Sequence, residues 1–589
     1  MACYRSNHIM PNTIAKVPVH GYANGNYSLD CIRWLDFVSF SEGINIQHAL
    51  NGRGEVSIEG MKVDGFCAET NTVYQFHGCF FHGCVKCYDR DVVNPVSGET
   101  MERLRVKTTE ISERIKRRGF NLIEIWEHDF ALMKKEASEV NLFLSTHEVV
   151  NRLNPRDAFF GSRTNAVKLI YEGVAKYIDF TNLYPWCNKY CRYPIGHPTI
   201  ITENFDNITN YFGFVKCKVL PLRRLYHLVL PCRSNGKLLF PLCRTCGDMS
   251  QQTPCHHNDD ERAFVGSWVT EEVKKAIQKG YQILKVYEVY HFEKSLSDLF
   301  KSYIDLFLQL KQEASGWPSG CETEEDKDEY IQSYFRKEGI LLRKDKIAFN
   351  LGQRAVAKLA LNSFWGRWGM SLIKMMLNFV GSLEEFNKFF SGNTKEIQDL
   401  FFPTETICAM QWKRKTEFID DDASTNIFIA AFTTCHARLK LYDELDKLGE
   451  QVLYFDTDSI IYASNGLNDP PLGNFLGEFT DELGGETIVK FVSGGPKNYA
   501  YVTDSGKSVC KVRGFCLNFK NSLSLNFDSI HSLVSNLDDR TAICIHDPSK
   551  IIRDAKKRRV LNKEETKEYR MVYNKRVLKP DYSTLPYGY

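Results

Sequence analysis

Short apolar runs bounded by turn residues recur along the chain and predict β-strands. At 451–462, two such runs flank Asp456-Thr457-Asp458, a pattern typical of a β-hairpin. Two carboxylates spaced by two positions would share one face if they lay on a single strand. Further strands are predicted at 55–66, 73–76, 122–126 and 175–180, the first two as a hairpin.

Other segments have the 3.6-residue spacing of amphipathic helices. Apolar positions recur at helical intervals in 300–312 and 354–366, and a further helix is predicted at 433–442. Residues 89–118 are rich in charge and predict a helix with a solvated face.

Composition limits the class of protein. The 589 residues, 43% of them hydrophobic, can fill about three or four domains. The 75 basic and 73 acidic residues leave a charge of +2, so any groove for nucleic acid must be local. No apolar run could cross a bilayer, and the start lacks the apolar core of a signal peptide. We therefore expect an intracellular protein of nucleus or cytoplasm, not secreted, without a membrane partner and with reduced cysteines.

Three aspartates form the strongest chemical pattern. Asp179 ends the strand at 175–180 and precedes a turn and a short helix, a position that suits a metal–triphosphate site. Asp456 and Asp458 repel each other unless a cation lies between them. A solvated acidic turn is the alternative for Asp456 and Asp458.

The helix at 354–366 carries one polar line on an otherwise apolar surface. Arg354, Lys358, Asn362 and Gly366 are four apart and therefore share a face. A basic line on a buried helix needs an anionic partner, such as a triphosphate. Surface ion pairs are the alternative.

Clustered cysteines predict two structural zinc sites, and buried free thiols are the alternative. The first set has the spacing C-x4-C-x2-C, with a histidine after a distant strand as fourth ligand: Cys79, Cys84, Cys87 and His128. The second set is Cys243, Cys246, Cys255 and either His256 or His257, of which we favour His257.

Residues 64–128 resemble the very-short-patch repair endonucleases, a branch of the restriction-endonuclease-like fold. The shared features are Asp64, the segment 77–82 (His-Gly-Cys-Phe-Phe-His) and Trp126-Glu127-His128. The resemblance implies that Asp64 binds a catalytic metal and that His77 or His82 assists. Gln75 stands where the wider superfamily often has an acidic residue, and an amide is a poorer Mg²⁺ ligand. Residues 1–150 are therefore predicted as an endonuclease-like zinc module, either active or a structural or DNA-binding remnant.

Residues 155 to 589 resemble family B DNA polymerases, with motifs in that family's order. Motif A, D-x-x-S-L-Y-P, is similar to 179–185; motif B, K-x-x-x-N-S-x-Y-G, to 358–366; and motif C to 454–459. The Y-x-G-G loop of protein-primed members is similar to 159–163, and K-x-Y to 497–499. The chain departs from these patterns at Phe160, Ser162, Asn182 and Trp365.

The resemblance implies a multi-domain α/β and α+β protein: the restriction-endonuclease-like module, then a right-hand polymerase with palm, fingers, thumb and insertions. The predicted boundaries are 151–198 for the linker loop and first palm segment, 199–299 for an insertion with a Cys/His knuckle, 300–372 for the fingers, 373–415 for a second insertion, 416–516 for the palm and 517–589 for the thumb. The basic cluster Lys556-Lys557-Arg558-Arg559 would belong to the thumb, and a nuclear-import signal is its rival interpretation.

The implied reaction is template-directed transfer of a nucleotide from a dNTP to a primer 3′-hydroxyl, with two Mg²⁺ ions held by Asp179, Asp456 and Asp458. Tyr184 would exclude a 2′-hydroxyl, and the other predicted dNTP contacts are Arg354, Lys358 and Asn362. The predicted primer or DNA contacts are Phe159, Gly161, Arg163, Ser363, Gly366, Thr457, Lys497, Tyr499 and Lys511.

The nearest resemblance is to polymerases of Maverick/polinton-like elements and related viruses, which implies replication of a viral or mobile element and a terminal protein as primer. No D-x-E motif followed by downstream aspartates is visible, so we expect no proofreading in this chain. The alternative function is a DNA-binding or nicking protein from a decayed element without polymerase activity.

Overall fold

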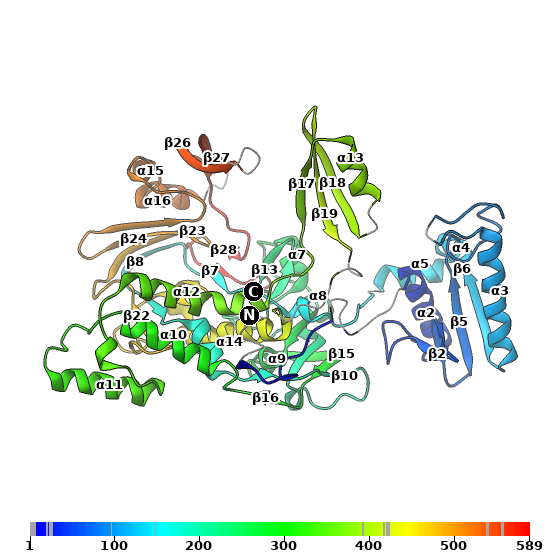
Figure 1. Ribbon diagram of the computed structural model, residues 1–589, viewed down its shortest axis with the longest axis horizontal. Coiled ribbons are helices and arrows are strands. Elements are labelled where there is room, and N and C mark those ends of the chain that lie inside the picture. The colour runs from blue at the N-terminus through cyan, green and yellow to red at the C-terminus, as the bar shows by residue number, and fades with distance from the viewer. Residues whose placement is uncertain are drawn as a thin grey trace.

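The computed structural model describes residues 8–18, 22, 27–95, 97–147, 149–391, 394–415, 419, 424–537, 541–554 and 559–589. A module of residues 27–147 lies to one side of a larger body (Figure 1). Both parts mix helices and strands, which confirms the expected mixed α/β fold. None of the described helices is long and apolar enough to cross a membrane. Lys556, Lys557 and Arg558 of the predicted basic cluster lie outside the described residues.

The module at 27–147 is a four-stranded sheet with helices on both faces. Its strand order is β1-β4-β5-β6, and β5 and β6 run parallel. One face packs on Ile115 of α3 through Val73, and the other packs on Phe130 of α4 through Phe76. The elements are β1 (Gln47–His48), β4 (Gly65–Cys67), β5 (Thr72–His77), β6 (Asn121–Trp126), α2 (Leu29–Glu42), α3 (Met101–Arg117), α4 (Glu127–Glu136) and α5 (Ser138–Thr146).

The predicted single strand at 55–66 is wrong in detail. Glu59 and Gly60 have φ values of 48° and 80°, the backbone of a tight two-residue turn. The chain therefore folds back as a separate hairpin, β2 (Val56–Ile58) with β3 (Met61–Val63), and the predicted partner strand β5 pairs with β4 instead.

An eight-stranded sheet is the centre of the larger body. Its order is β25-β24-β23-β8-β21-β20-β7, and β22 also pairs with β8. Alternate residues of β8 face opposite sides, so Ile178 packs on α14 (Ile427–Leu448) and Tyr177 on α16 (Phe527–Ser535). The strands are β7 (Thr164–Ala166), β8 (Ile170–Phe180), β20 (Val452–Asp456), β21 (Ser459–Ala463), β22 (Phe479–Asp481), β23 (Ile488–Gly495), β24 (Asn498–Thr503) and β25 (Ser508–Val512). The structure confirms the predicted hairpin at 451–462, the strand at 175–180 and the helix at 433–442.

Residues 193–296 add a second sheet beneath α14. Its order is β10-β15-β11-β14, and the buried pair of Arg438 in α14 with Glu272 in α9 joins the two parts at 2.8 and 2.9 Å. The elements are β9 (Tyr193–Pro194), β10 (Thr199–Ile201), β11 (Gly213–Leu220), β12 (Cys232–Ser234), β13 (Lys237–Leu239), α7 (Arg244–Met249), α8 (Asp259–Arg262), β14 (Phe264–Val269), α9 (Thr270–Gln278), β15 (Gln282–His291) and β16 (Ser295–Leu296).

Three helices, α10 (Lys301–Glu313), α11 (Glu324–Glu338) and α12 (Leu351–Trp368), form a layer beside the central sheet. Leu308 of α10 and Leu361 of α12 share one apolar core, and the two predicted helices are confirmed. After α12 the chain forms a separate three-stranded sheet in the order β17-β19-β18 with α13 on one face: β17 (Met376–Val380), α13 (Leu383–Ser391), β18 (Lys395–Thr404) and β19 (Ile407–Arg414).

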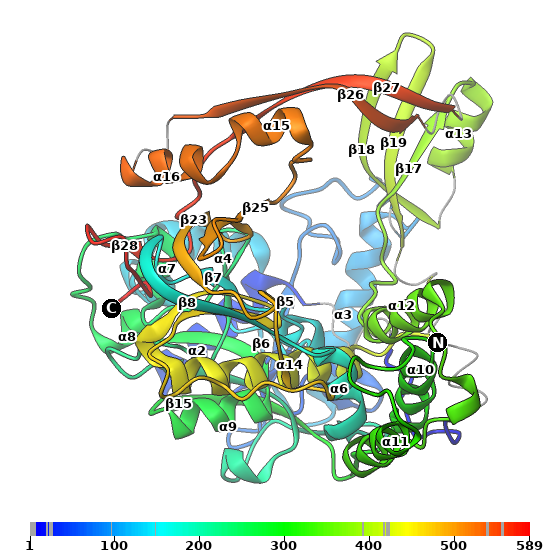
Figure 2. The same cartoon turned by 90° about the vertical axis from the view of Figure 1, so that its left-hand side faces the viewer.

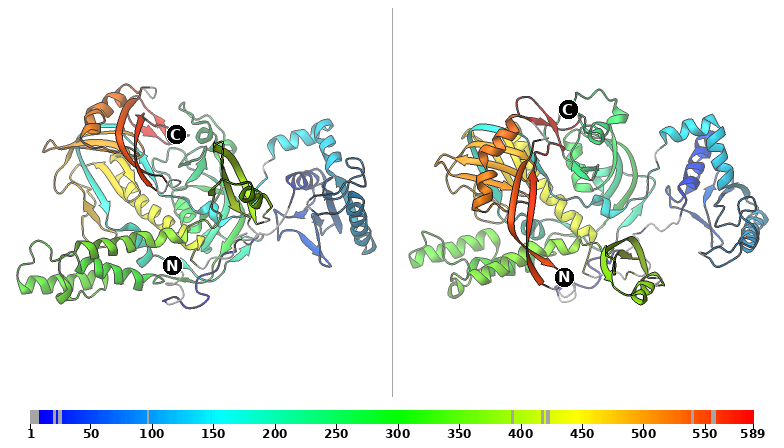
Figure 3. Two further views of the ribbon diagram at one scale, coloured as in Figure 1. Left: turned by 45° about the horizontal axis from the view of Figure 1, so that its top comes forward. Right: turned by 90° about the horizontal axis from the view of Figure 1, so that it is seen from above.

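The last segment divides in two. Helices α15 (Phe519–Ser524) and α16 lead to the long hairpin of β26 (Ile543–Asp554) and β27 (Arg559–Tyr569), which extends above the central sheet (Figure 2). The chain then returns to β7, where the Thr584 amide donates to the Val167 carbonyl at 2.8 Å, and forms β28 (Val577–Leu578) and β29 (Thr584–Leu585). Seen from above, the hairpin, the small sheet β17–β19 and the module at 27–147 are separate projections (Figure 3).

Candidate active site and metal centres

Asp179 lies in β8, and Asp458 lies in the turn that leads into the neighbouring strand β21. Asp179 in β8 is opposite Ser459 of β21, and the Phe180 amide donates to the Asp458 carbonyl at 2.7 Å. Thr457 turns the hairpin with a φ of 61°, so Asp456 ends β20 while Asp458 lies in the turn. The two hairpin aspartates therefore do not share one strand, and Asp458 is the one adjacent to Asp179.

The ionised forms of these two carboxyls are disfavoured. Burial, followed by the nearby charge of Asp458, raises the pKa of Asp179 to about 7. Burial and then the charge of Asp456 raise the pKa of Asp458 to about 6. A divalent cation would stabilise the ionised forms of these two carboxyls, because opposite charges attract. Mg²⁺ is a suitable cation, since it prefers oxygen ligands.

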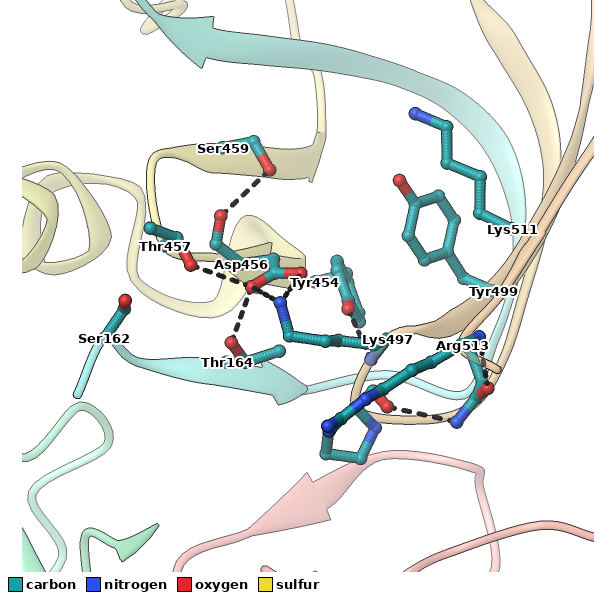
Figure 4. Close-up of polar contacts among 12 residues, drawn as sticks. Ser162, Thr164, Tyr454, Asp456, Thr457, Ser459, Lys497, Tyr499, Lys511 and Arg513 are labelled. Atoms are coloured by element: carbon teal, nitrogen blue, oxygen red, sulfur yellow. Dashed lines mark hydrogen bonds and ion pairs between the residues drawn. The ribbon is translucent and has the colours of Figure 1, made fainter. Parts of the chain in front are cut away.

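Asp456 differs because protein groups already satisfy its carboxylate (Figure 4). Its Oδ1 accepts hydrogen bonds from Thr164 Oγ1 at 2.6 Å and Thr457 Oγ1 at 3.0 Å. Lys497 Nζ lies 3.1 Å from both carboxylate oxygens. Lys497 reaches Asp456 from the turn between β23 and β24, and Thr164 is a partner that the sequence did not indicate.

A group of cations lies on the helical layer. The burial of Lys311 in α10, with the charges of Arg354 and Lys358 in α12, lowers the pKa of Lys311 to about 8. No ion pair joins these three side chains to a carboxylate within the part of the chain that the structure describes. The charge of Lys358 partly offsets the raised pKa of Asp179, so this cation acts on the carboxylate site. Lys311 is a candidate that sequence reasoning missed.

The remaining predicted contact residues of α12 differ in how accessible they are to a ligand. Asn362 and Gly366 are exposed, and a Cβ at Gly366 would meet no atom within 4 Å. The Ser363 hydroxyl donates to the Leu359 carbonyl of the same helix at 2.7 Å. Asn362 and Gly366 are thus accessible to a ligand, whereas the Ser363 hydroxyl has a partner within the helix.

The loop before β7 corrects one prediction. Gly161 is exposed and Phe159 half-buried, but Arg163 is only 3% exposed. The Arg163 guanidinium lies 4.1 Å from the Phe240 ring centroid and donates to the Leu228 carbonyl. Arg163 therefore holds the loop to the core and has no surface with which to contact DNA. Arg438 supports the same loop through the carbonyls of Phe160 and Gly161, at 2.7 and 3.1 Å.

Tyr499 and Lys511 lie on the neighbouring strands β24 and β25 (Figure 4). The Tyr499 ring is 6% exposed and packs 4.8 Å from Tyr454, while its hydroxyl lies 3.1 Å from that of Tyr177. A ring buried in this way cannot stack on a base, which corrects the stacking alternative for Tyr499. Lys511 is exposed and lies close enough to Asp179 to lower its pKa.

Both predicted Cys/His sets come together in the structure. Cys79, Cys84, Cys87 and His128 form one group, and Cys243, Cys246, Cys255 and His257 the other, each with donor atoms within 4.8 Å of one another. The His128 Nδ1 lies 3.2 and 3.5 Å from two of its sulfurs, and the His257 Nδ1 lies 3.3 to 3.6 Å from three. Donors of a tetrahedral zinc site with ordinary bond lengths are about 3.5 Å apart, so both sets fit zinc.

Of the predicted nuclease residues, Gln75 and His77 lie in β5, Asp64 lies between β3 and β4, and His82 lies in the turns after β5. Asp64 accepts a hydrogen bond from the Phe76 amide at 2.7 Å, and burial raises its pKa to about 6. His77 Nε2 lies 2.9 Å from Glu124 of β6, a residue whose strand neighbour is Gln75. Gln75 and His77 are buried, and burial lowers the pKa of His82 to about 4. The His77 and His82 rings lie 5.0 Å apart by their centroids, and His82 Nδ1 lies 3.2 Å from Thr108 Oγ1 of α3.

Comparisons with known proteins agree on one class. Residues 123–319 match the family model described as DNA polymerase type B, organellar and viral. Two curated relatives are each described as a probable DNA polymerase. The one from Neurospora intermedia is 24% identical over 377 residues, and the one from Podospora anserina 25% over 403.

The alignments cover 61% and 62% of this chain but 32% and 28% of the relatives, so the chain spans about a third of their length. Among solved structures, Phi29 DNA polymerase with primer-template DNA and incoming nucleotide aligns with a TM-score of 0.45 and 14% identity, over 75% of this chain and 66% of that one. Phi29 DNA polymerase with single-stranded DNA gives a TM-score of 0.44. In sequence, the chain is therefore similar to the type B DNA polymerases of organellar and viral type over part of its length.

Proposed function

We propose that this protein is a DNA-directed DNA polymerase, which transfers a nucleotide from a dNTP to a primer 3′-hydroxyl under the direction of a template. The observation that carries the proposal is the pairing of a group of carboxylates in the sheet with a group of cations on the helical layer. Burial and neighbouring carboxylates raise the pKa values of Asp179 and Asp458. Lys311, Arg354 and Lys358 repel one another and have no carboxylate within ion-pair distance among the described residues. A metal–triphosphate complex would neutralise both groups at once.

Asp179 and Asp458 would hold the two Mg²⁺ ions, which, when bound, lower the pKa of the attacking hydroxyl and stabilise the leaving pyrophosphate. Asp456 is assigned a supporting role, because Lys497, Thr164 and Thr457 already satisfy its oxygens. It fixes the Lys497 ammonium, which would contact the primer phosphate beside the reacting end.

The chain's own residues position the other reactant. Lys358 and Arg354 would bind the β- and γ-phosphates, with Lys311 as a third cation, and Asn362 lies on the same exposed helix face. Fixed charges that face the phosphates need no rearrangement during the reaction, which is the main way in which a protein accelerates phosphoryl transfer.

The units of the larger body are assigned accordingly. The central sheet is the palm, α10 to α12 the fingers, and α15, α16 and hairpin β26–β27 the thumb. The sheet β17–β19 and residues 199–299 are the two insertions. The proposed function includes priming by a terminal protein during replication of a viral or mobile element. Detection of a covalent protein–dNMP adduct in the absence of a DNA primer would test this priming mode.

The two Cys₃His sets are proposed as structural zinc sites. The second lies in the core shared by residues 199–299 and α14, so zinc there would support the palm. Metal analysis of the purified chain should find two zinc ions, and Cys84→Ser or Cys243→Ser should each remove one. Zinc content that neither substitution lowers would contradict the assignment.

Primer extension on a DNA template tests the polymerase proposal. With Mg²⁺ and dNTPs, the wild type should add the complementary nucleotides, and Asp458→Ala should reduce extension by about 10³-fold or more because a charge-stabilising group is lost. Asp64→Ala, in the module at 27–147, is the matched control and should extend at the wild-type rate. Extension that survives Asp458→Ala, or a well-folded wild type that never extends, would refute the proposal.

A further inference from the structure

Two positions at which this chain departs from the family B motifs meet at Tyr184. Ser162 Oγ lies 3.0 Å from the Tyr184 hydroxyl, within hydrogen-bond distance. The Trp365 ring stacks on the Tyr184 ring with centroids 4.3 Å apart and planes at 21°. Ser162 and Trp365 are 203 positions apart in sequence (365 minus 162), so the fold brings both departures to one side chain.

Tyr184 lies at the centre of the proposed nucleotide site. It is in the first turn of α6 (Leu183–Tyr190), five residues after Asp179. Burial, with a smaller contribution from the charge of Asp458, raises the pKa of Tyr184. Trp365 is seven residues, about two turns, after Lys358 and so shares its face of α12. Tyr184 therefore follows Asp179 closely in the chain and stacks on a residue of the helix face that carries Lys358.

The two contacts restrain different motions of the ring. Stacking on Trp365 blocks one face, which opposes rotation of the ring toward α12. The bond to Ser162 fixes the hydroxyl end, and the loop that carries Ser162 is itself held by Arg438 through two backbone carbonyls. Figure 4 shows Ser162 on this loop beside the Asp456 turn. A ring held at its face and its tip cannot tilt to make room for a larger sugar.

We propose that Ser162 and Trp365 are positioning residues that fix Tyr184 and thereby set the preference for deoxyribose over ribose. The inference rests on the proposed polymerase function and deepens it. A glycine at position 162, as in the Y-x-G-G pattern, could make no such bond. The serine thus supplies a restraint that the resemblance to the family does not include.

Selectivity is measured as the ratio of kcat/KM for dATP to that for ATP on one primer-template. Because a single hydrogen bond contributes modestly, we expect Ser162→Ala to lower this ratio about 2- to 10-fold, through faster ATP incorporation. The effect should appear mainly in the kcat/KM for ATP rather than in that for dATP. Trp365→Ala should lower the ratio further than Ser162→Ala, and Trp365→Tyr, which keeps an aromatic ring, should lower it less.

A double-mutant cycle separates this bond from a general loosening of the fold. Tyr184→Phe removes the hydroxyl and should match Ser162→Ala, and the double variant should be no less selective than either single one. Ser505→Ala, at the remote end of the β24–β25 hairpin, is the control and should not change the ratio. An unchanged ratio in Ser162→Ala, or effects of the two single changes that multiply, would overturn the inference while leaving the polymerase proposal intact.

A wild type that incorporates no dNTP would instead contradict the proposed function. In that case, tryptophan fluorescence titrations with dATP and ATP still decide the inference, because Trp365 stacks on Tyr184. Preference for dATP that weakens in Ser162→Ala would support the inference. Equal binding of the two nucleotides by the wild type and by Ser162→Ala would contradict it.

Discussion

The central sheet and the module at 27–147 both place aspartate, histidine or lysine side chains in patterns that resemble catalytic motifs, yet they differ in how the charges are balanced. In the sheet, burial and the charge of Asp458 raise the pKa of Asp179, and Lys311, Arg354 and Lys358 have no carboxylate ion-pair partner among the described residues. In the module, Asp64 accepts a backbone hydrogen bond, and His77 has Glu124. Glu124 also contacts Ser112 and lies 3.8 Å from Lys116.

The difference distinguishes a candidate ligand-binding site from a group of side chains that mainly stabilises the fold. Buried polar groups without partners are costly, so a protein keeps them where a ligand completes them. Buried polar groups with partners contribute to stability and specificity of the fold. The central sheet, where carboxylates lie near cations that have no carboxylate partner among the described residues, is the catalytic candidate. In the module, Asp64 and His77 Nε2 have protein partners, whereas His77 Nδ1 is buried without one in the described part of the chain.

The larger of two expected changes in stability is that of a substitution in the module. His77→Ala leaves the Glu124 carboxylate without its histidine partner, so local stability of the module should fall by about 1–3 kcal/mol. Hydrogen exchange of the amides of β5 and β6 measures this loss. Primer extension should remain at the wild-type rate.

Glu110→Ala, on the exposed face of α3, is the control and should change neither property. Extension that falls sharply in a folded His77→Ala protein would break the comparison, because it would give the module a part in synthesis.

In the central sheet, replacement of Asp179 is expected to increase stability, by less than His77→Ala decreases it in the module. The folded-state pKa of Asp179 is about 7, above its ordinary value, so its ionisation disfavours the fold. This destabilisation grows as the pH rises from about 4 to 7 and is complete above pH 7. In EDTA at pH 8, Asp179→Asn should therefore be more stable than wild type by about 1–2 kcal/mol, after allowance for solvent screening.

Thermal unfolding in EDTA across this pH range measures the difference. The stabilities of wild type and Asp179→Asn should converge near pH 4, where the Asp179 carboxyl of the folded wild type is protonated. Mg²⁺ should stabilise the wild type more than the variant. An Asp179→Asn protein less stable than wild type at pH 8 in EDTA would show that the sheet's charges are compensated after all.

The sequence predicts those features that depend on local pattern. The strand before Asp179, the hairpin at Asp456 to Asp458 and the helix with Lys358 each follow from apolar spacing and are present. The gathering of Cys243, Cys246, Cys255 and His257 also follows from close spacing, since four ligands lie within fifteen residues.

Features that depend on tertiary packing were not predictable in this way. Arg163 resembles a DNA contact in sequence but is buried against Phe240, which lies 77 positions later (240 minus 163). Lys311 lies among the apolar positions of its helix and becomes notable only because α12 brings Arg354 and Lys358 beside it. No spacing along the chain indicates either neighbour.

The central claim is that the carboxylates of the sheet and the cations of α12 form one nucleotide site with divided roles. Single-nucleotide incorporation kinetics test it directly, with Asp458→Asn and Lys358→Ala compared on the same primer-template. We predict that Asp458→Asn lowers kcat by about 10³-fold with a small change in the KM for dNTP, because its charge acts in the transition state. Lys358→Ala should raise the KM by about 10-fold or more, because it binds the phosphates. A wild-type kcat in Asp458→Asn, or an unchanged KM and kcat in Lys358→Ala, would contradict the account.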